Sequence, residues 1–216
     1  MLRGRMTPFD LATLPYPVPD RIVATLRRDW VRLSSPGSCF TGPERVAIAA
    51  DVRRIRTGEA ATSPLPAVVV ETARTTATAP AGIRRTWVER LVADGLSESA
   101  YVETVGVAAR IVAVDTFHRG LGAALEPLPA PRPGKPTGAV DPNARPSKGF
   151  VAMAHGTGSW WAVSLVPEAF AGMEDFHNTL YLSPEEMMAA APPRRLSRPQ
   201  IELVAARTSA VNECFY

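Results

Sequence analysis

Two cysteines are the only thiols in this chain of 216 residues, and the residues around the second one point to redox chemistry. Cys214 stands in the last four residues, Glu213-Cys214-Phe215-Tyr216, one position short of a complete C-x-x-C motif. Two thiols at that spacing do redox work because a short loop lets the second sulfur reach the first. We therefore expect Cys214 to be one half of a redox pair.

A carboxylate precedes this thiol on a predicted helix. The sequence Ser197-Arg198-Pro199-Gln200 is a capping box with proline in the first turn, so a helix should begin there. Glu202 lies in that helix, twelve positions before Cys214. On a straight helix twelve residues span about 18 Å, so direct contact is excluded. Two interpretations of Glu202 stay open: an exposed surface carboxylate, or a functional one that acts through a break in the helix or a relay.

Residues 196–216 resemble the core helix of the alkylhydroperoxidase D-like and carboxymuconolactone decarboxylase family. In that family a capped helix carries a glutamate, then S-A-x-N-x-C, then x-x-C and a histidine four residues later. This chain matches the pattern at Glu202, Ser209, Ala210, Asn212 and Cys214. Residues 166–170 resemble the upstream helix of the family, and residues 96–106 resemble the helix that normally follows the redox motif.

The resemblance implies an all-α fold, a helical bundle of the alkylhydroperoxidase D-like type, with a degenerate first module and a partial second module. Residues 1–126 would be a thiol-free module, because alignment of the two capping boxes on their prolines puts Gly58 where the second copy has Cys214. Residues 127–146 would be a Pro-rich linker. Residues 147–216 would be a partial second module that ends at the first Cys of an incomplete CxxC. A gene fragment, a split or misread reading frame, a truncated chain or a natural remnant would each give this pattern.

The function that the resemblance implies is that of a thiol peroxidase-like antioxidant protein, an oxidoreductase with a hydroperoxide substrate and a thiol reductant. In the family mechanism a thiolate attacks the peroxide, and the resulting sulfenic acid condenses with the partner cysteine. Cys214 would be the resolving partner, and Glu202 would belong to the proton relay. Two alternatives stay open: a catalytically inactive scaffold or interaction module, and a carboxymuconolactone decarboxylase-like protein that uses no redox thiol.

The remaining chemically active side chains carry weaker signals. Cys39 sits in a Ser-Pro-Gly loop with no histidine or acidic residue nearby in sequence, so we expect a bystander thiol. The histidines His118, His155 and His177 stand far from one another and from both cysteines, which excludes a zinc-ligand spacing. We expect no metal and no cofactor.

The elements that must position these residues are helices, because the long segments are rich in Ala, Leu, Arg and Glu. Apolar spacing and caps predict helices at 19–33, 41–56, 67–76, 83–93, 97–119, 160–176 and 184–191. Pro167 indicates a break or a new start within the sixth of these. Seven prolines between Pro127 and Pro146 exclude a helix there.

Composition narrows the class of protein further. The net charge of +3 is spread over arginine pairs rather than gathered on one face, so we expect no nucleic-acid partner. No apolar run approaches the roughly 18 residues of a membrane helix, and the first six residues lack a secretory signal. We expect a cytoplasmic protein without a membrane partner. Family members bury helix faces between subunits, and the apolar stretch 160–165 favours a homo-oligomer.

Overall fold

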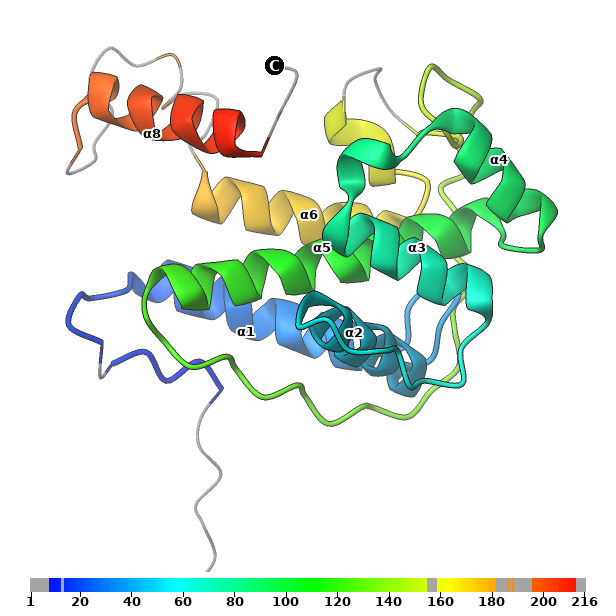
Figure 1. Cartoon of the computed structure of the whole chain (residues 1–216), viewed down its shortest axis with the longest axis horizontal. Helices are drawn as coiled ribbons and strands as arrows, with labels where there is room; N and C mark the ends of the chain where they lie inside the picture. Colours follow the sequence, from blue (N-terminus) through cyan, green and yellow to red (C-terminus); the bar gives the residue numbers. More distant parts are fainter. Residues whose placement is uncertain are drawn as a thin grey trace, which may run out of the picture. The chain divides into compact units, whose positions relative to one another are not determined.

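The computed structural model describes residues 8–12, 14–154, 159–181, 186, 188 and 196–212, the side chains of residues 159 and 160 excepted. Over these residues it has seven α-helices and two short 3₁₀ helices, and its one β-type pairing is an isolated bridge between Arg145 and Met153 (Figure 1). The prediction of an all-α class is confirmed. Within the same residues no helix is both long enough and apolar enough to cross a membrane.

Helices α1 and α2 form where the sequence predicts them. Helix α1 spans Asp20–Ser34 and buries Leu26, Trp30 and Leu33, which lie on one face at spacings of four and three. Helix α2 spans Gly42–Arg56 and begins at a capping box. The amide of Thr41 donates to Glu44 Oε2 at 2.8 Å, so the reciprocal bond expected from the sequence is present.

Helix α5 is the central element. The chain passes through α3 (Ala67–Thr78), α4 (Arg85–Ala93) and then α5 (Glu98–Gly120). Ser97 caps α5, since its hydroxyl accepts from the amide of Ala100 at 3.1 Å. Figure 1 shows α5 running through the bundle with α1 and α2 on one side and α6 on the other. Most of its circumference is buried and Ala109, Ala113 and Thr116 mark its exposed side, so α5 carries charged residues into the interior.

The Pro-rich stretch 127–146 has no helix, as predicted, but it is held against the bundle. The amides of Arg132, Thr137 and Gly138 donate to the carbonyl oxygens of the loop at 34–38, at 2.8 to 2.9 Å. The indole of Trp30 donates to the carbonyl of Pro127 at 2.9 Å. Figure 1 shows the stretch as a trace that follows the helices. Proline has no backbone N–H, so this stretch cannot form a regular hydrogen-bonded element of its own. These hydrogen bonds to the bundle give its backbone polar groups their partners instead.

The chain divides into two compact units, Met1–Phe176 and His177–Tyr216. The Pro-rich composition predicts a boundary at 127–146, whereas the structure divides the chain after Phe176. The physical reason is the core: Leu165, Val166 and Ala169 are buried in the same apolar cluster as α1 to α5. Helix α6 spans Pro167–Leu180 and begins at Pro167, the expected new start.

The second unit contains α8 (Arg198–Val211), and none of the described residues of this helix is buried. The predicted helix at 184–191 falls mostly outside the described residues.

Candidate functional site

The helix that carries the predicted redox motif forms as the sequence indicates. The amide of Ser197 donates to Gln200 Oε1 at 2.8 Å, which forms the predicted capping box at the start of α8. The helix closes at Asn212, whose Nδ2 donates to the carbonyl of Thr208 at 3.0 Å. Cys214 lies two positions further on, outside the described residues.

Glu202 is a surface residue of α8. Its side chain is 55% exposed and pairs with Arg198, one helical turn earlier, with 2.6 Å between Oε1 and Nε. Exposed pairs of this kind contribute at most about 1 kcal/mol to stability. The described contacts of Glu202 are therefore those of an exposed carboxylate, the first of the two interpretations.

Cys39, expected to be a bystander, has an acidic neighbour that only the fold provides. Its amide donates to Glu103 Oε2 at 2.6 Å, across 64 positions of sequence. Burial raises the pKa of the Cys39 thiol; a hydrogen bond with Ser99 opposes this shift and the charge of Glu103 adds to it. A raised pKa leaves little thiolate, which is the reactive form. The geometry thus makes Cys39 a poorly activated thiol.

Glu103 belongs to a set of interior charges that we call the buried ion network: Asp29, Arg45, Glu103, Arg110 and Glu168. Its centre is Arg45, whose side chain is fully buried. Arg45 Nη1 lies 3.2 Å from Glu103 Oε1. Its two terminal nitrogens donate to the two oxygens of Glu168 at 3.0 and 3.1 Å, the fork geometry that favours arginine over lysine.

Arg110 forms the second half of the buried ion network. Its Nη1 donates to Asp29 Oδ1 at 3.0 Å and lies 3.8 Å from Glu168 Oε1. Its Nε donates to the carbonyl of Gly106 at 3.1 Å. The network therefore joins α1, α2, α5 and α6 through charge-assisted bonds.

Burial and charge act in opposite directions on the three carboxylates. Burial raises the pKa of Asp29 and of Glu103, because Arg110 and Arg45 offset only part of the lost hydration. Burial also pushes the pKa of Glu168 upward, but the charges of Arg110 and Arg45 outweigh it and hold this pKa below its ordinary value. Of the three carboxylates in the buried ion network, Glu168 is the one whose side chain is partly exposed to solvent. The arrangement suits a structural clamp, since Asp29 and Glu103, the two carboxylates with a raised pKa, are shielded from solvent.

The buried ion network was not predicted from the sequence, although α1 and α5 contain a signal for it. Asp29 lies three residues after Leu26 and four before Leu33, so it shares the apolar face of α1. On α5, Glu103 and Arg110 are seven positions apart and share a face. Charged residues at apolar positions indicate buried pairs, but the identity of their partners cannot be read from spacing.

Gly37 shows how closely the loop before α2 approaches the network. A Cβ at this position would stand 1.8 Å from Glu103 Oε1 and 2.1 Å from Arg45 Nη1. A Cβ at position 37 would therefore displace the side chains of this buried ion pair.

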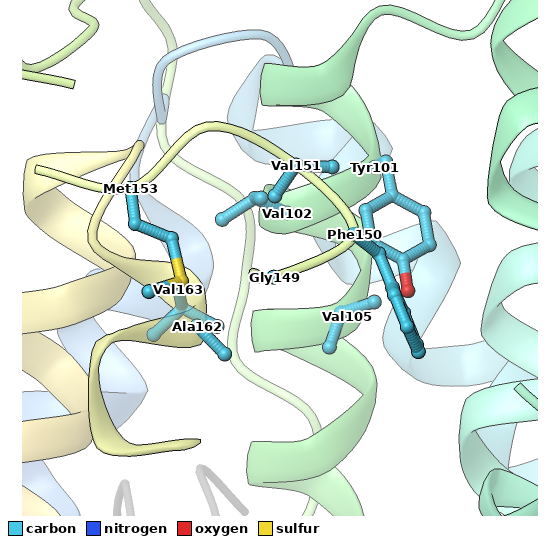
Figure 2. Close-up of a pocket in the computed structure, with 9 residues that line it drawn as sticks. All are labelled: Tyr101, Val102, Val105, Gly149, Phe150, Val151, Met153, Ala162 and Val163. Atoms are coloured by element: carbon cyan, nitrogen blue, oxygen red, sulfur yellow. The ribbon is translucent and has the colours of Figure 1, made fainter. Parts of the chain in front are cut away.

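A small apolar cavity of about 90 Å³ lies between α5 and the segments around residues 149–153 and 159–163. Figure 2 shows Tyr101, Val102 and Val105 projecting from α5, with Met153 and Val163 contributed by the other segments. A cavity that binds benzene measures about 150 Å³, so this one is too small for a substrate of that size.

The described residues contain no group of three His, Cys, Asp or Glu side chains that could hold a metal ion. Comparison of the chain with family models, with curated proteins and with solved structures gives no match.

Proposed function

We propose that this chain is a thiol peroxidase-like protein of the alkylhydroperoxidase D-like type, which reduces hydroperoxides with the help of a thiol reductant. One observation supports the proposal: α8 begins at the Ser197–Gln200 capping box and ends at Val211, three positions before Cys214 in the sequence. The all-α fold of the described residues is compatible with it.

The chemistry proceeds through the thiolate of the motif. In a complete C-x-x-C, Cys214 would resolve the sulfenic acid of the downstream cysteine. Within these 216 residues Cys214 is the one thiol of the motif, and with this thiol alone turnover would use an outside thiol. Its thiolate attacks R–OOH: an S–O bond forms, the O–O bond breaks, and the alkoxide takes a proton to become R–OH. One reductant thiol then forms a mixed disulfide and releases water, and a second frees Cys214 and leaves as the oxidised disulfide.

A scaffold or interaction module is the second candidate, and the surface of α8 favours it. Leu203, Val204 and Val211 are 70%, 57% and 67% exposed. Apolar side chains gathered on one helix are typical of a contact surface for another protein. The predicted homo-oligomer would use such a surface.

A thiol-dependent cumene hydroperoxide assay separates these candidates. We expect Cys214→Ser to lose the rate above background, because the nucleophile is gone. Cys39→Ser should keep the rate of the unaltered chain, because the Cys39 thiol is poorly ionised. Equal rates for the unaltered chain and Cys214→Ser would remove the peroxidase proposal and leave the scaffold.

A further inference from the structure

The middle of the Pro-rich stretch 127–146, which we call the strap, is held to the bundle by hydrogen bonds rather than by buried side chains. None of the strap residues is buried, and residues 130–135 are all exposed. Leu128 and Ala144, near the two ends of the strap, are partly buried and pack against the core. A segment with few buried apolar contacts needs little free energy to open locally. The strap between residues 130 and 140 should therefore open before the core does.

The loop between α1 and α2 receives the hydrogen bonds of this middle part. Among the described residues, the bonds that join strap residues 130–140 to the bundle all lead to residues 34–38. The amides of Thr137 and Gly138 donate to carbonyl oxygens of this loop, each at 2.9 Å. The hydroxyl of Ser38 donates in the opposite direction, to the carbonyl oxygen of Ala139. Strap and loop therefore share the contacts that either of them must break in order to move away.

The same loop covers the ion pair between Arg45 and Glu103, whose side chains are fully buried. The amide of Cys39 donates to Glu103 Oε2 at 2.6 Å. A Cβ at Gly37 would stand 1.8 Å from Glu103 Oε1, so the loop backbone lies directly on the carboxylate. Strap, loop and ion pair are thus three successive layers. Phe40, which is 7% exposed, fixes the end of the loop in the core.

We propose that strap residues 130–140 and loop residues 35–39 form a gate that opens as one local unit, and that its opening admits water and small solutes to Cys39 and to the Arg45–Glu103 pair. The gate opens without unfolding of the helices, because the helices keep their own core. It does not depend on Cys214 or on the proposed peroxidase activity.

Native-state hydrogen exchange of the full chain, measured by NMR, tests the gate. The amides of Thr137, Gly138 and Cys39 should have protection factors that agree within about threefold, because one opening exposes all three. These protection factors should be lower than that of Ile111, a buried residue of α5 that reports global unfolding. Separate values for the strap and for Cys39, or exchange of all three only together with Ile111, would overturn the proposal.

A pair of serine variants tests whether the strap and the loop are coupled. Ser38→Ala removes the hydroxyl that donates to Ala139, so exchange at Thr137, Gly138 and Cys39 should accelerate about threefold to tenfold. Ser63→Ala is the matched control, because it removes a hydroxyl that donates to Asp51, outside the gate. It should leave exchange at the three amides unchanged. Acceleration confined to the strap, or equal acceleration in the control, would contradict a coupled gate.

The thiol of Cys39 gives a second measurement of the same opening. In a Cys214→Ser background Cys39 is the one thiol left in the 216 residues, and it is partly buried. Its reaction with the aromatic disulfide dithiobis(nitrobenzoate) should be about threefold to tenfold faster in Ser38→Ala and unchanged in Ser63→Ala. Equal labelling rates in all three chains would show that the reagent reaches Cys39 through the closed gate, which would refute the control of this thiol by the gate.

Discussion

Arg45 illustrates how a single residue connects distant parts of this molecule. It enters the core in the first turns of α2 and reaches one carboxylate on α5 and one on α6. Taking such a charge out of water costs several kcal/mol, which is recovered only when every partner is in place. The pairs therefore fix the positions of three helices more than they add to stability.

Arg45→Met should lower the free energy of unfolding by about 3–5 kcal/mol, because Glu103 and Glu168 would be left without their buried partner. Urea unfolding, monitored by circular dichroism, measures this change in free energy. Arg54→Met, which breaks the exposed pair with Glu59, is the control and should cost about 1 kcal/mol or less. A similar small loss in both variants would show that the network is not required for folding.

Asp175 makes stability depend on pH in a defined direction. Hydrogen bonds from Arg28 and Arg32 lower its pKa in the folded state, although partial burial opposes them. A carboxylate with a lowered folded pKa stabilises the fold above the ordinary value of about 3.9, and this contribution is lost as the pH falls below it.

Asp175→Asn should therefore be less stable than the unaltered chain at neutral pH, by at most about 1 kcal/mol because Arg28 is half exposed. The difference should shrink as the pH falls below the ordinary value of about 3.9. Thermal unfolding above and below that value measures it, with Asp94→Asn at an exposed pair with Arg90 as control. A difference that stays constant with pH would rule out the titration of Asp175 as its cause.

At the scale of elements, α2 and α8 start alike and differ in what surrounds them. Each begins at a capping box with proline in its first turn. Helix α2 buries one face, with Ile48, Val52 and Ile55 against the core. Helix α8 has no buried residue among those described. The same local signal thus starts a helix that packs in the core and a helix that remains exposed.

Loss of the cap should have different consequences in the two helices. Thr41→Ala should lower the global free energy of unfolding by about 1 kcal/mol, because α2 is part of the core. Ser197→Ala, which removes the hydroxyl that donates to Gln200 Oε1, should leave global stability unchanged and speed amide exchange in α8. Chemical unfolding measures the global free energy of unfolding, and hydrogen exchange measures local opening of each helix. A lower global free energy of unfolding in Ser197→Ala would mean that α8 folds together with the core.

At the scale of the molecule, the first unit is larger than the module expected from the sequence. Residues after 126 supply core side chains, the carboxylate of Glu168, and the strap at 127–146 that binds the loop before α2. A module that ended at residue 126 would expose the apolar surface that these residues cover.

Truncated chains test this directly. A chain of residues 1–181 should unfold in one cooperative transition near the temperature of the full chain, because it keeps the first unit whole. A chain of residues 1–126 should show no cooperative transition, because it lacks Val166, Ala169 and Glu168. Calorimetry distinguishes the two, and cooperative unfolding of 1–126 would support a domain boundary at 127–146.

The sequence by itself determined where most of the described helices start, but the helix predicted at 160–176 is a 3₁₀ helix at Ser159–Val163 followed by α6, which runs on to Leu180. Caps such as Thr41 and Ser97, the positive φ at Gly58 and the new start at Pro167 act within a few residues of where they stand. Only the tertiary structure decided that Arg45 meets Glu168 across 123 positions, and that the Cys39 amide meets Glu103 across 64. Local spacing carries no information on such pairs, because they depend on which helix faces meet when the core forms.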